Sequence, residues 1–172
     1  MSTTTTRLFN FSAGPAVMPL PVLEEAQRDL IALPGVGMSV MEISHRSKPF
    51  EDILNTAVAN IRQLANVPSN YKVLMLQGGA SLQFSMVPMN LLTPGATADY
   101  IDSGSWADKA IKEAKRVGTV NVTGSTKADN YSRIADASEM TLTAGAAYVH
   151  TTTNNTIEGT QWNGLPEGAG DA

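Results

Sequence analysis

The sequence predicts an α/β fold with a mostly parallel sheet and flanking helices, and three observations carry this prediction. Short apolar runs of strand length alternate with longer segments in which apolar residues recur at helical spacing. Glycine, proline or asparagine stands at most of the boundaries between these segments. The resulting order of strand, helix, strand, helix and strand is typical of a sheet whose strands run mainly in parallel.

The first third of the chain predicts two helices. One begins at Pro19 to Pro21 and ends before Pro34, because proline fits the first turn of a helix and cannot continue its interior. The other covers residues 50–64, where apolar side chains recur every 3.6 residues, and Pro68 follows it.

The rest of the chain predicts the sheet. The expected strands are residues 71–77, as a buried strand, and residues 98–102, 119–123 and 146–151. Helices are expected at residues 81–92, with a kink at Pro88, and at residues 106–117. The intervening residues 124–143 are polar and have no clear pattern.

Composition excludes several classes of function. The net charge of −4 and the isoelectric point near 5.1 argue against a nucleic-acid-binding surface. The absence of cysteine excludes disulfides, thiolate catalysis and cysteine-ligated zinc, and no spacing of His, Asp and Glu supports another metal site. No apolar run approaches the roughly 20 residues that span a bilayer, and the N-terminus lacks the apolar run of a signal peptide. A cytoplasmic enzyme with no nucleic-acid, membrane or metal partner is expected.

Three loops follow predicted strands: Gly78–Ser81, Ser103–Trp106 and Thr152–Thr156. In parallel sheets, ligands bind beyond the carboxyl ends of the strands, which is where these loops are expected. The first precedes a helix and is glycine-rich, which suits a phosphate, although a simple strand-to-helix turn has the same composition. Trp106 could stack on a flat ring or pack as an ordinary core residue. The hydroxyls of the third loop could donate to a ligand, or belong to an ordinary polar loop.

A cationic run, His45-Arg46-Ser47-Lys48, separates the first two predicted helices. The guanidinium of Arg46 can form a bidentate pair with a carboxylate or phosphate. An acidic ligand is one interpretation of this run, and a solvated loop is the other.

Taken together, these segments resemble the phosphoserine aminotransferase family, which consists of class-V, fold-type I enzymes that use pyridoxal 5'-phosphate (PLP). The resemblance runs from Leu8 to about Thr160 through FNFSAGPAVMP, SVMEISHRSKPF, NVPSNYKVLMLQGGAS, TADYIDSGSWADKAIKEAK and NNTIEGT, in that order. It implies an incomplete large PLP-binding domain. Residues 1–18 would form an N-terminal arm and substrate-side segment, and residues 19–172 the N-terminal part of that domain, without its remainder or the small C-terminal domain.

The resemblance also implies a reaction. Members move an amino group from glutamate through PLP to 3-phosphohydroxypyruvate in serine biosynthesis, and many bacterial members act in vitamin B6 biosynthesis as well. They are homodimers. The matched positions assign Ala80 and Ser81 to the cofactor phosphate, Trp106 to stacking on the cofactor ring and Thr156 to the ring oxygen.

On the substrate side, the resemblance assigns Ser12 and Arg46 to contacts with the amino-acid substrate, with His45 beside them. Some members carry an arginine near the position of Ser81, whereas this loop has Gly-Gly-Ala-Ser. The lysine that forms the Schiff base with PLP would lie beyond residue 172, so no catalytic residue is assigned within this chain. The chain alone is therefore expected to be an inactive fragment.

Two other hypotheses remain open from the sequence. One is a non-catalytic α/β module that binds a phosphorylated metabolite through residues 78–81. The other is an interaction fragment that completes its sheet by docking onto a separate C-terminal chain of the same enzyme.

Overall fold

A computed structural model describes residues 7–12, 14–164 and 166, and the chain forms two compact units. One unit ends at Met75 and the other begins at Leu76. The boundary expected after residue 18 stays a prediction. None of the helices formed by the described residues has the length and apolar character needed to cross a membrane.

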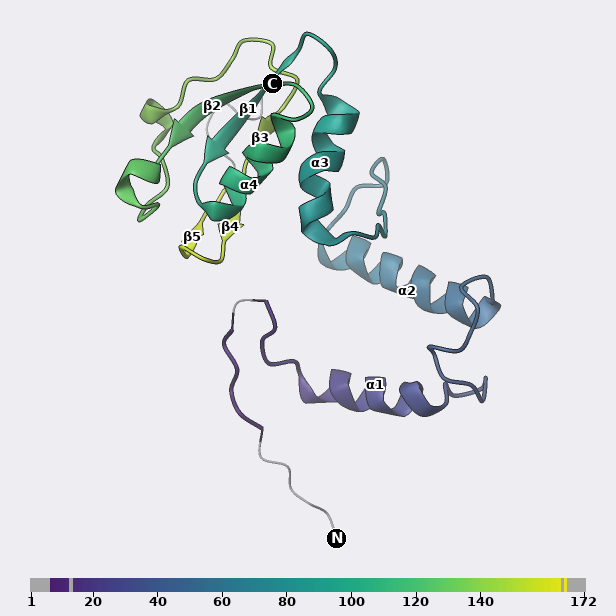
Figure 1. Cartoon of the computed structure of the whole chain (residues 1–172). Helices are drawn as coiled ribbons and strands as arrows, with labels where there is room; N and C mark the ends of the chain where they lie inside the picture. The colour runs from purple at the N-terminus through teal and green to yellow at the C-terminus, as the bar shows by residue number, and fades with distance from the viewer. Residues whose placement is uncertain (1–6, 13, 165, 167–172) are drawn as a thin grey trace. The chain divides into compact units, whose positions relative to one another are not determined.

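The first unit contains the two helices that the sequence predicts, α1 (Leu20–Ile31) and α2 (Lys48–Leu64) (Figure 1). Each has a proline in its first turn, where the missing N–H is not needed. The turn after α2 is held by Arg62, whose guanidinium donates to the carbonyl oxygens of Pro68 and Tyr71 at 3.2 and 2.5 Å. Neither helix contains a buried residue, so the described residues leave their apolar stripes largely uncovered.

The buried strand expected at residues 71–77 is wrong. These residues form no strand, and Leu74, Met75 and Leu76 are more than half exposed. A strand exists only where a second strand accepts and donates its backbone hydrogen bonds, and no described segment pairs with this run. Apolar composition alone therefore predicted the wrong structure here.

The second unit is built on a three-stranded sheet of β1 (Thr97–Asp102), β2 (Thr119–Ser125) and β3 (Val149–His150). All pairs are parallel and the order is β2-β1-β3, which places β1 at the centre (Figure 1). The predicted α/β class with a parallel sheet is confirmed. The predicted strand at 146–151 is shorter than expected, because only two of its residues pair with β1.

Two helices accompany this sheet, α3 (Gly79–Leu91) and α4 (Ser105–Ala114). Pro88 lies inside α3 and is buried. Alanines at the buried face of α4 allow it to pack closely on β1 and α3, which forms a core of Leu92, Ala98, Tyr100, Ala110, Ile111 and Ala114. This packing fixes the first turns of both helices beside the ends of the strands.

The polar segment after β2 contains two 3-10 turns, Lys127–Asp129 and Ala137–Glu139. It is anchored by Asp99, a fully buried carboxylate on the central strand. Asp99 accepts hydrogen bonds from the backbone N–H and hydroxyl of Thr143, at 2.6 and 2.7 Å, and from the Asn121 amide at 3.1 Å. These bonds satisfy the buried carboxylate oxygens and fix the approach to β3.

A short antiparallel hairpin follows β3 and is formed by β4 (Asn154–Asn155) and β5 (Thr160–Gln161). The Thr160 hydroxyl donates to the carbonyl oxygen of Ser103 at 2.8 Å, which joins the hairpin to the loop after β1. The sequence predicted only a polar loop at this place.

Candidate functional site

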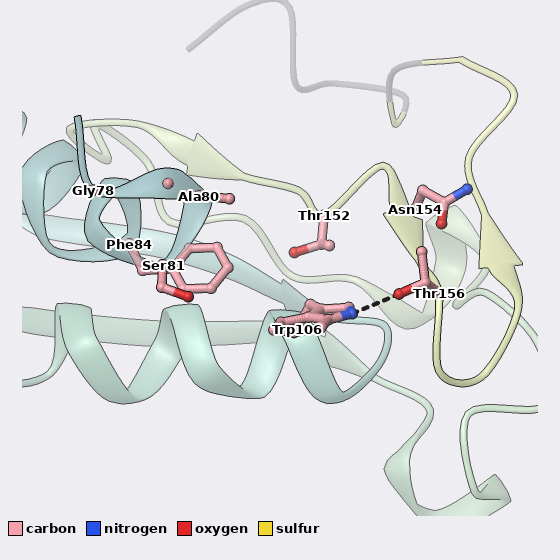
Figure 2. Close-up of a pocket in the computed structure, with 9 residues that line it drawn as sticks. Gly78, Ala80, Ser81, Phe84, Trp106, Thr152, Asn154 and Thr156 are labelled. Atoms are coloured by element: carbon pink, nitrogen blue, oxygen red, sulfur yellow. Dashed lines mark hydrogen bonds between the residues drawn. The ribbon is translucent and has the colours of Figure 1, made fainter. Parts of the chain in front are cut away.

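A pocket of about 410 Å³ lies in the second unit and is built from the three loops that the sequence singled out. This volume is in the range of small-molecule sites. Figure 2 shows its lining, which consists of Gly78, Gly79, Ala80, Ser81, Phe84, Trp106, Thr152, Asn154 and Thr156. The structure therefore brings together the four residues that were assigned to a cofactor, although their individual roles stay predictions.

One wall of the pocket is the N-terminus of α3. Gly78 and Gly79 have φ angles of +97° and +62°, a backbone region that favours glycine. No side chain caps this helix, and no described residue accepts a hydrogen bond from the backbone N–H of Ala80 or Ser81. Unpaired N–H groups at the positive end of a helix dipole attract an anion such as a phosphate.

The N-terminus of α4 borders the same pocket but is closed by the hairpin. Asn155 accepts hydrogen bonds through Oδ1 from the backbone N–H of Trp106 at 3.2 Å and of Ala107 at 3.4 Å. Glu158 accepts through Oε1 from the backbone N–H of Ser105 at 3.0 Å and from the Ser105 hydroxyl. Because these N–H groups have partners, α4 does not offer them to an anion.

The indole of Trp106 is oriented by the hairpin as well. Its Nε1–H donates to the Thr156 hydroxyl oxygen at 2.9 Å, the contact drawn as a dashed line in Figure 2. Since Thr156 accepts this bond, its own hydroxyl hydrogen is available to donate to a ligand. The Lys109 ammonium lies over the indole, 4.1 Å from the ring centroid, and leaves only the other face for a stacked ring.

Several lining residues were missed by sequence reasoning. Thr152 contributes a buried hydroxyl oxygen with no partner among the described residues, and in Figure 2 it points toward the pocket. Phe84 and Asn154 complete the lining. The loop that contains Thr152 and Asn154 had been singled out, but nothing in its composition distinguishes the residues that face a pocket from those that do not.

The strand that leads to Thr152 carries a histidine in an apolar setting. The ring of His150 stacks on Tyr100 with 4.7 Å between ring centroids, and its Nδ1 is buried without a partner among the described residues. Burial lowers the pKa of His150. Burial also raises the pKa of Tyr100, whose hydroxyl hydrogen-bonds that of Tyr148 at 2.8 Å. Both rings therefore favour their neutral forms.

The predicted substrate residues Ser12, His45 and Arg46 lie in the first unit, and all three are exposed. The pocket lining comes only from the second unit, so they are not part of it. The backbone N–H of Arg46 donates to the Ser44 hydroxyl at 3.1 Å, and its guanidinium has no ion pair with a described carboxylate. Among the residues that the structure describes, no group of three or more His, Asp or Glu side chains could hold a metal.

Comparison with known proteins gives a consistent result. A profile of the class-V aminotransferase family matches residues 8–169. The chain is 52% identical over 160 residues to a phosphoserine aminotransferase of Geobacillus kaustophilus, an alignment that covers 93% of this chain and 44% of that protein. The chain thus spans less than half the length of the curated relatives that it matches.

Solved structures agree. The phosphoserine aminotransferase from Bacillus circulans subsp. alkalophilus superposes with a TM-score of 0.89 at 48% identity, covering 94% of this chain and 45% of that one. A PLP-bound phosphoserine aminotransferase from Trichomonas vaginalis superposes with a TM-score of 0.87 at 38% identity, covering 94% and 46%. The predicted fold class, part of a large fold-type I domain, is confirmed by these matches.

Proposed function

This chain belongs to the class-V aminotransferase family, and we propose that it is part of a phosphoserine aminotransferase that uses PLP. The proposed reaction transfers an amino group from glutamate to 3-phosphohydroxypyruvate. The observation that carries the proposal is the single pocket in which an open helix N-terminus, an indole and a free hydroxyl hydrogen meet. The names of the relatives support the choice of substrates.

The chemistry of the lining fits PLP. Phosphate oxygens need donors, and the N–H groups of Ala80 and Ser81 with the Ser81 hydroxyl supply them. The aromatic ring needs a flat apolar surface, which Trp106 provides, and the ring oxygen needs a donor, which Thr156 provides. PLP supplies the electron-withdrawing ring and carbonyl carbon that amino-group transfer requires. The protein residues bind the group, orient it and fix the plane of its ring.

The substrate side of the proposal rests on Arg46. Its exposed guanidinium has no described ion-pair partner, and both proposed substrates carry carboxylates. A guanidinium binds a carboxylate through two parallel hydrogen bonds, which a lysine cannot reproduce. Ser12 and His45 are proposed to contribute further polar contacts to the same substrates.

No described lysine lines the pocket, so the residue that binds PLP covalently is proposed to lie outside this chain. It can belong to the same polypeptide or to a separate C-terminal chain. A homodimer in the cytoplasm and a second role in vitamin B6 synthesis complete the proposal. A non-catalytic module that binds a phosphorylated metabolite is the second candidate, and the same absence of a lining lysine favours it.

PLP binding and transamination by the complete gene product test the proposal. We expect PLP to bind and phosphoserine with 2-oxoglutarate to yield glutamate. Replacing Trp106 by alanine should weaken PLP binding about tenfold, and replacement by phenylalanine should do so less, because most of the stacking area remains. Binding of phosphate esters without transamination would favour the non-catalytic module. Failure of PLP to bind at all would refute the proposed cofactor.

A further inference from the structure

We infer that Asn155 is a positioning residue, which sets the orientation of Trp106 in the pocket by joining the β4–β5 hairpin to the first turn of α4. Asn155 does not line the pocket. Its effect on the pocket passes through its neighbours in the chain and in space.

The side chain of Asn155 is completely buried, and every hydrogen bond it makes leads to the segment that begins α4. Its Oδ1 accepts from the N–H groups of Trp106 and Ala107, and its Nδ2 donates to the Ser103 hydroxyl at 3.1 Å. A buried amide on which three groups depend holds one position, because any displacement leaves unpaired polar atoms inside the protein.

Trp106 is consequently attached to the hairpin at two points. Asn155 holds its backbone N–H, and Thr156, the next residue, holds its indole Nε1–H. The two attachments lie at opposite ends of the tryptophan, so together they limit rotation of the indole. A shift of Asn155 moves Thr156 with it and changes both the ring plane and the direction of the Thr156 hydroxyl.

The available space restricts which side chains can do this. A Cβ built on Gly104 would lie 2.4 Å from Cγ of Asn155, so the side chain packs directly on the backbone before α4. Aspartate has the same shape and keeps both acceptor contacts, and the Ser103 hydroxyl can rotate to donate to it. Leucine has nearly the same size but accepts no hydrogen bond. The pair Asn155→Asp and Asn155→Leu therefore separates hydrogen bonding from packing.

The orientation of Trp106 by Asn155 follows from the geometry of the chain alone. The effect of this orientation on PLP affinity rests on the function proposed above. The experiment uses the complete gene product labelled with ¹⁵N-tryptophan, and the indole N–H signal of Trp106 is identified by its loss in Trp106→Phe. Its chemical shift and hydrogen exchange are measured without ligand, and PLP affinity is measured separately by titration.

For Asn155→Leu we expect a displaced Trp106 signal, faster indole exchange and a PLP dissociation constant raised about tenfold. For Asn155→Asp we expect the wild-type signal and affinity within about threefold. Asn163→Leu, which changes an exposed amide just after the hairpin and outside the pocket lining, is the matched control and should change neither. If Asn155→Leu does not fold, Asn155→Ser replaces it, since serine is too short to reach both N–H groups.

An unchanged Trp106 signal in folded Asn155→Leu or Asn155→Ser would overturn the inference, as would equal effects of aspartate and leucine. If the wild type does not bind PLP, the proposed function fails while the ligand-free signals still decide the role of Asn155.

Discussion

The first turns of α3 and α4 border one pocket, yet their backbone N–H groups differ in whether they have hydrogen-bond partners. The N–H groups of α4 are capped by Asn155 and Glu158, which come from a hairpin about fifty residues away in the chain. The N-terminus of α3 has no such cap within the described part of the chain. Both helices begin after a glycine, so the difference lies in what the rest of the fold brings to them.

This difference indicates that the two helix N-termini have different roles at the pocket. An uncapped N-terminus costs stability, because its N–H groups lack protein partners, but it keeps those groups available for an anion. A capped N-terminus is rigid and cannot bind an anion, but it can carry a side chain in a fixed orientation. We infer that the N-terminus of α3 is the binding end, which binds the anion. The N-terminus of α4 is the supporting end, which holds Trp106 in a fixed orientation.

The largest expected effect comes from disturbing the supporting end with Gly104→Ala. The added Cβ would meet Cβ, Cγ and Oδ1 of Asn155 at 2.4 to 2.6 Å, and this side chain is fully buried and cannot move away. We expect the free energy of unfolding to fall by about 2–3 kcal/mol in a denaturant titration. Gly164→Ala, where no described atom lies within 4 Å, is the control and should change it by less than about 0.5 kcal/mol. Equal stability of both variants would show that the hairpin does not hold α4.

A smaller effect is expected from Gly78→Ala at the binding end. The φ angle of +97° disfavours alanine by about 1–2 kcal/mol, and the new Cβ would meet Cδ2 and Cβ of Leu82 at 2.3 and 2.8 Å. The side chain of Leu82 is 40% exposed and can rotate, whereas its Cβ can yield only if the first turn of α3 shifts. Because this turn is exposed, it can shift, and the loss of stability should be less than at Gly104. The more specific result is weaker PLP binding, by about tenfold, because the N–H groups of Ala80 and Ser81 are displaced.

Gly95→Ala controls for backbone strain in this experiment. Gly95 has a φ angle of +84°, no described atom lies within 4 Å of an added Cβ, and it does not line the pocket. Gly95→Ala should lose only the roughly 1–2 kcal/mol that the φ angle costs and retain wild-type PLP affinity, measured by the same titration. If Gly95→Ala weakened PLP binding as much as Gly78→Ala does, the loop before α3 would not be the phosphate site.

The same contrast marks the limit of prediction from the sequence. The strands β1 and β2 and the helix α4 were predicted within a few residues, because apolar spacing and flanking glycines are local signals. The loops after β1 and β3 followed from the rule for parallel sheets. The loop Gly78–Ser81 was chosen by the same rule from a strand that does not form, yet the structure brings all three loops to one pocket. The prediction of a strand at residues 71–77 was wrong because a strand needs a second segment to pair with. The sequence of one segment does not show whether such a partner is present.

Capping of α4 was not predicted for a related reason. Asn155 and Trp106 are 49 residues apart, and no local sequence pattern at either residue indicates that the two are in contact. The two-residue strands β4 and β5 are too short for an alternating pattern to develop. The sequence therefore predicted residues that line the pocket more readily than those that hold them in place.

The smallest and most discriminating test is a matched pair of serines, one in the first turn of each helix. Ser81→Ala removes a hydroxyl that faces the pocket and has no described protein partner, so stability should change by less than about 0.5 kcal/mol. PLP affinity should fall about fivefold, the equivalent of one hydrogen bond of about 1 kcal/mol, while the backbone N–H groups still bind.

Ser105→Ala should give the opposite result. Its hydroxyl donates to the carboxylate of Glu158 and does not line the pocket. A hydrogen bond to a charged group contributes about 1.5–3 kcal/mol, and since the backbone N–H of Ser105 still donates to Glu158, we expect a loss near the lower value. PLP affinity should stay within about twofold of the wild type, because this change does not reach Asn155 or Thr156. Thermal unfolding and PLP titration give the stability and the PLP affinity of each of the two variants. A loss of PLP affinity in Ser105→Ala, or a loss of stability in Ser81→Ala, would show that α3 is not the binding end alone or that α4 is not the supporting end alone.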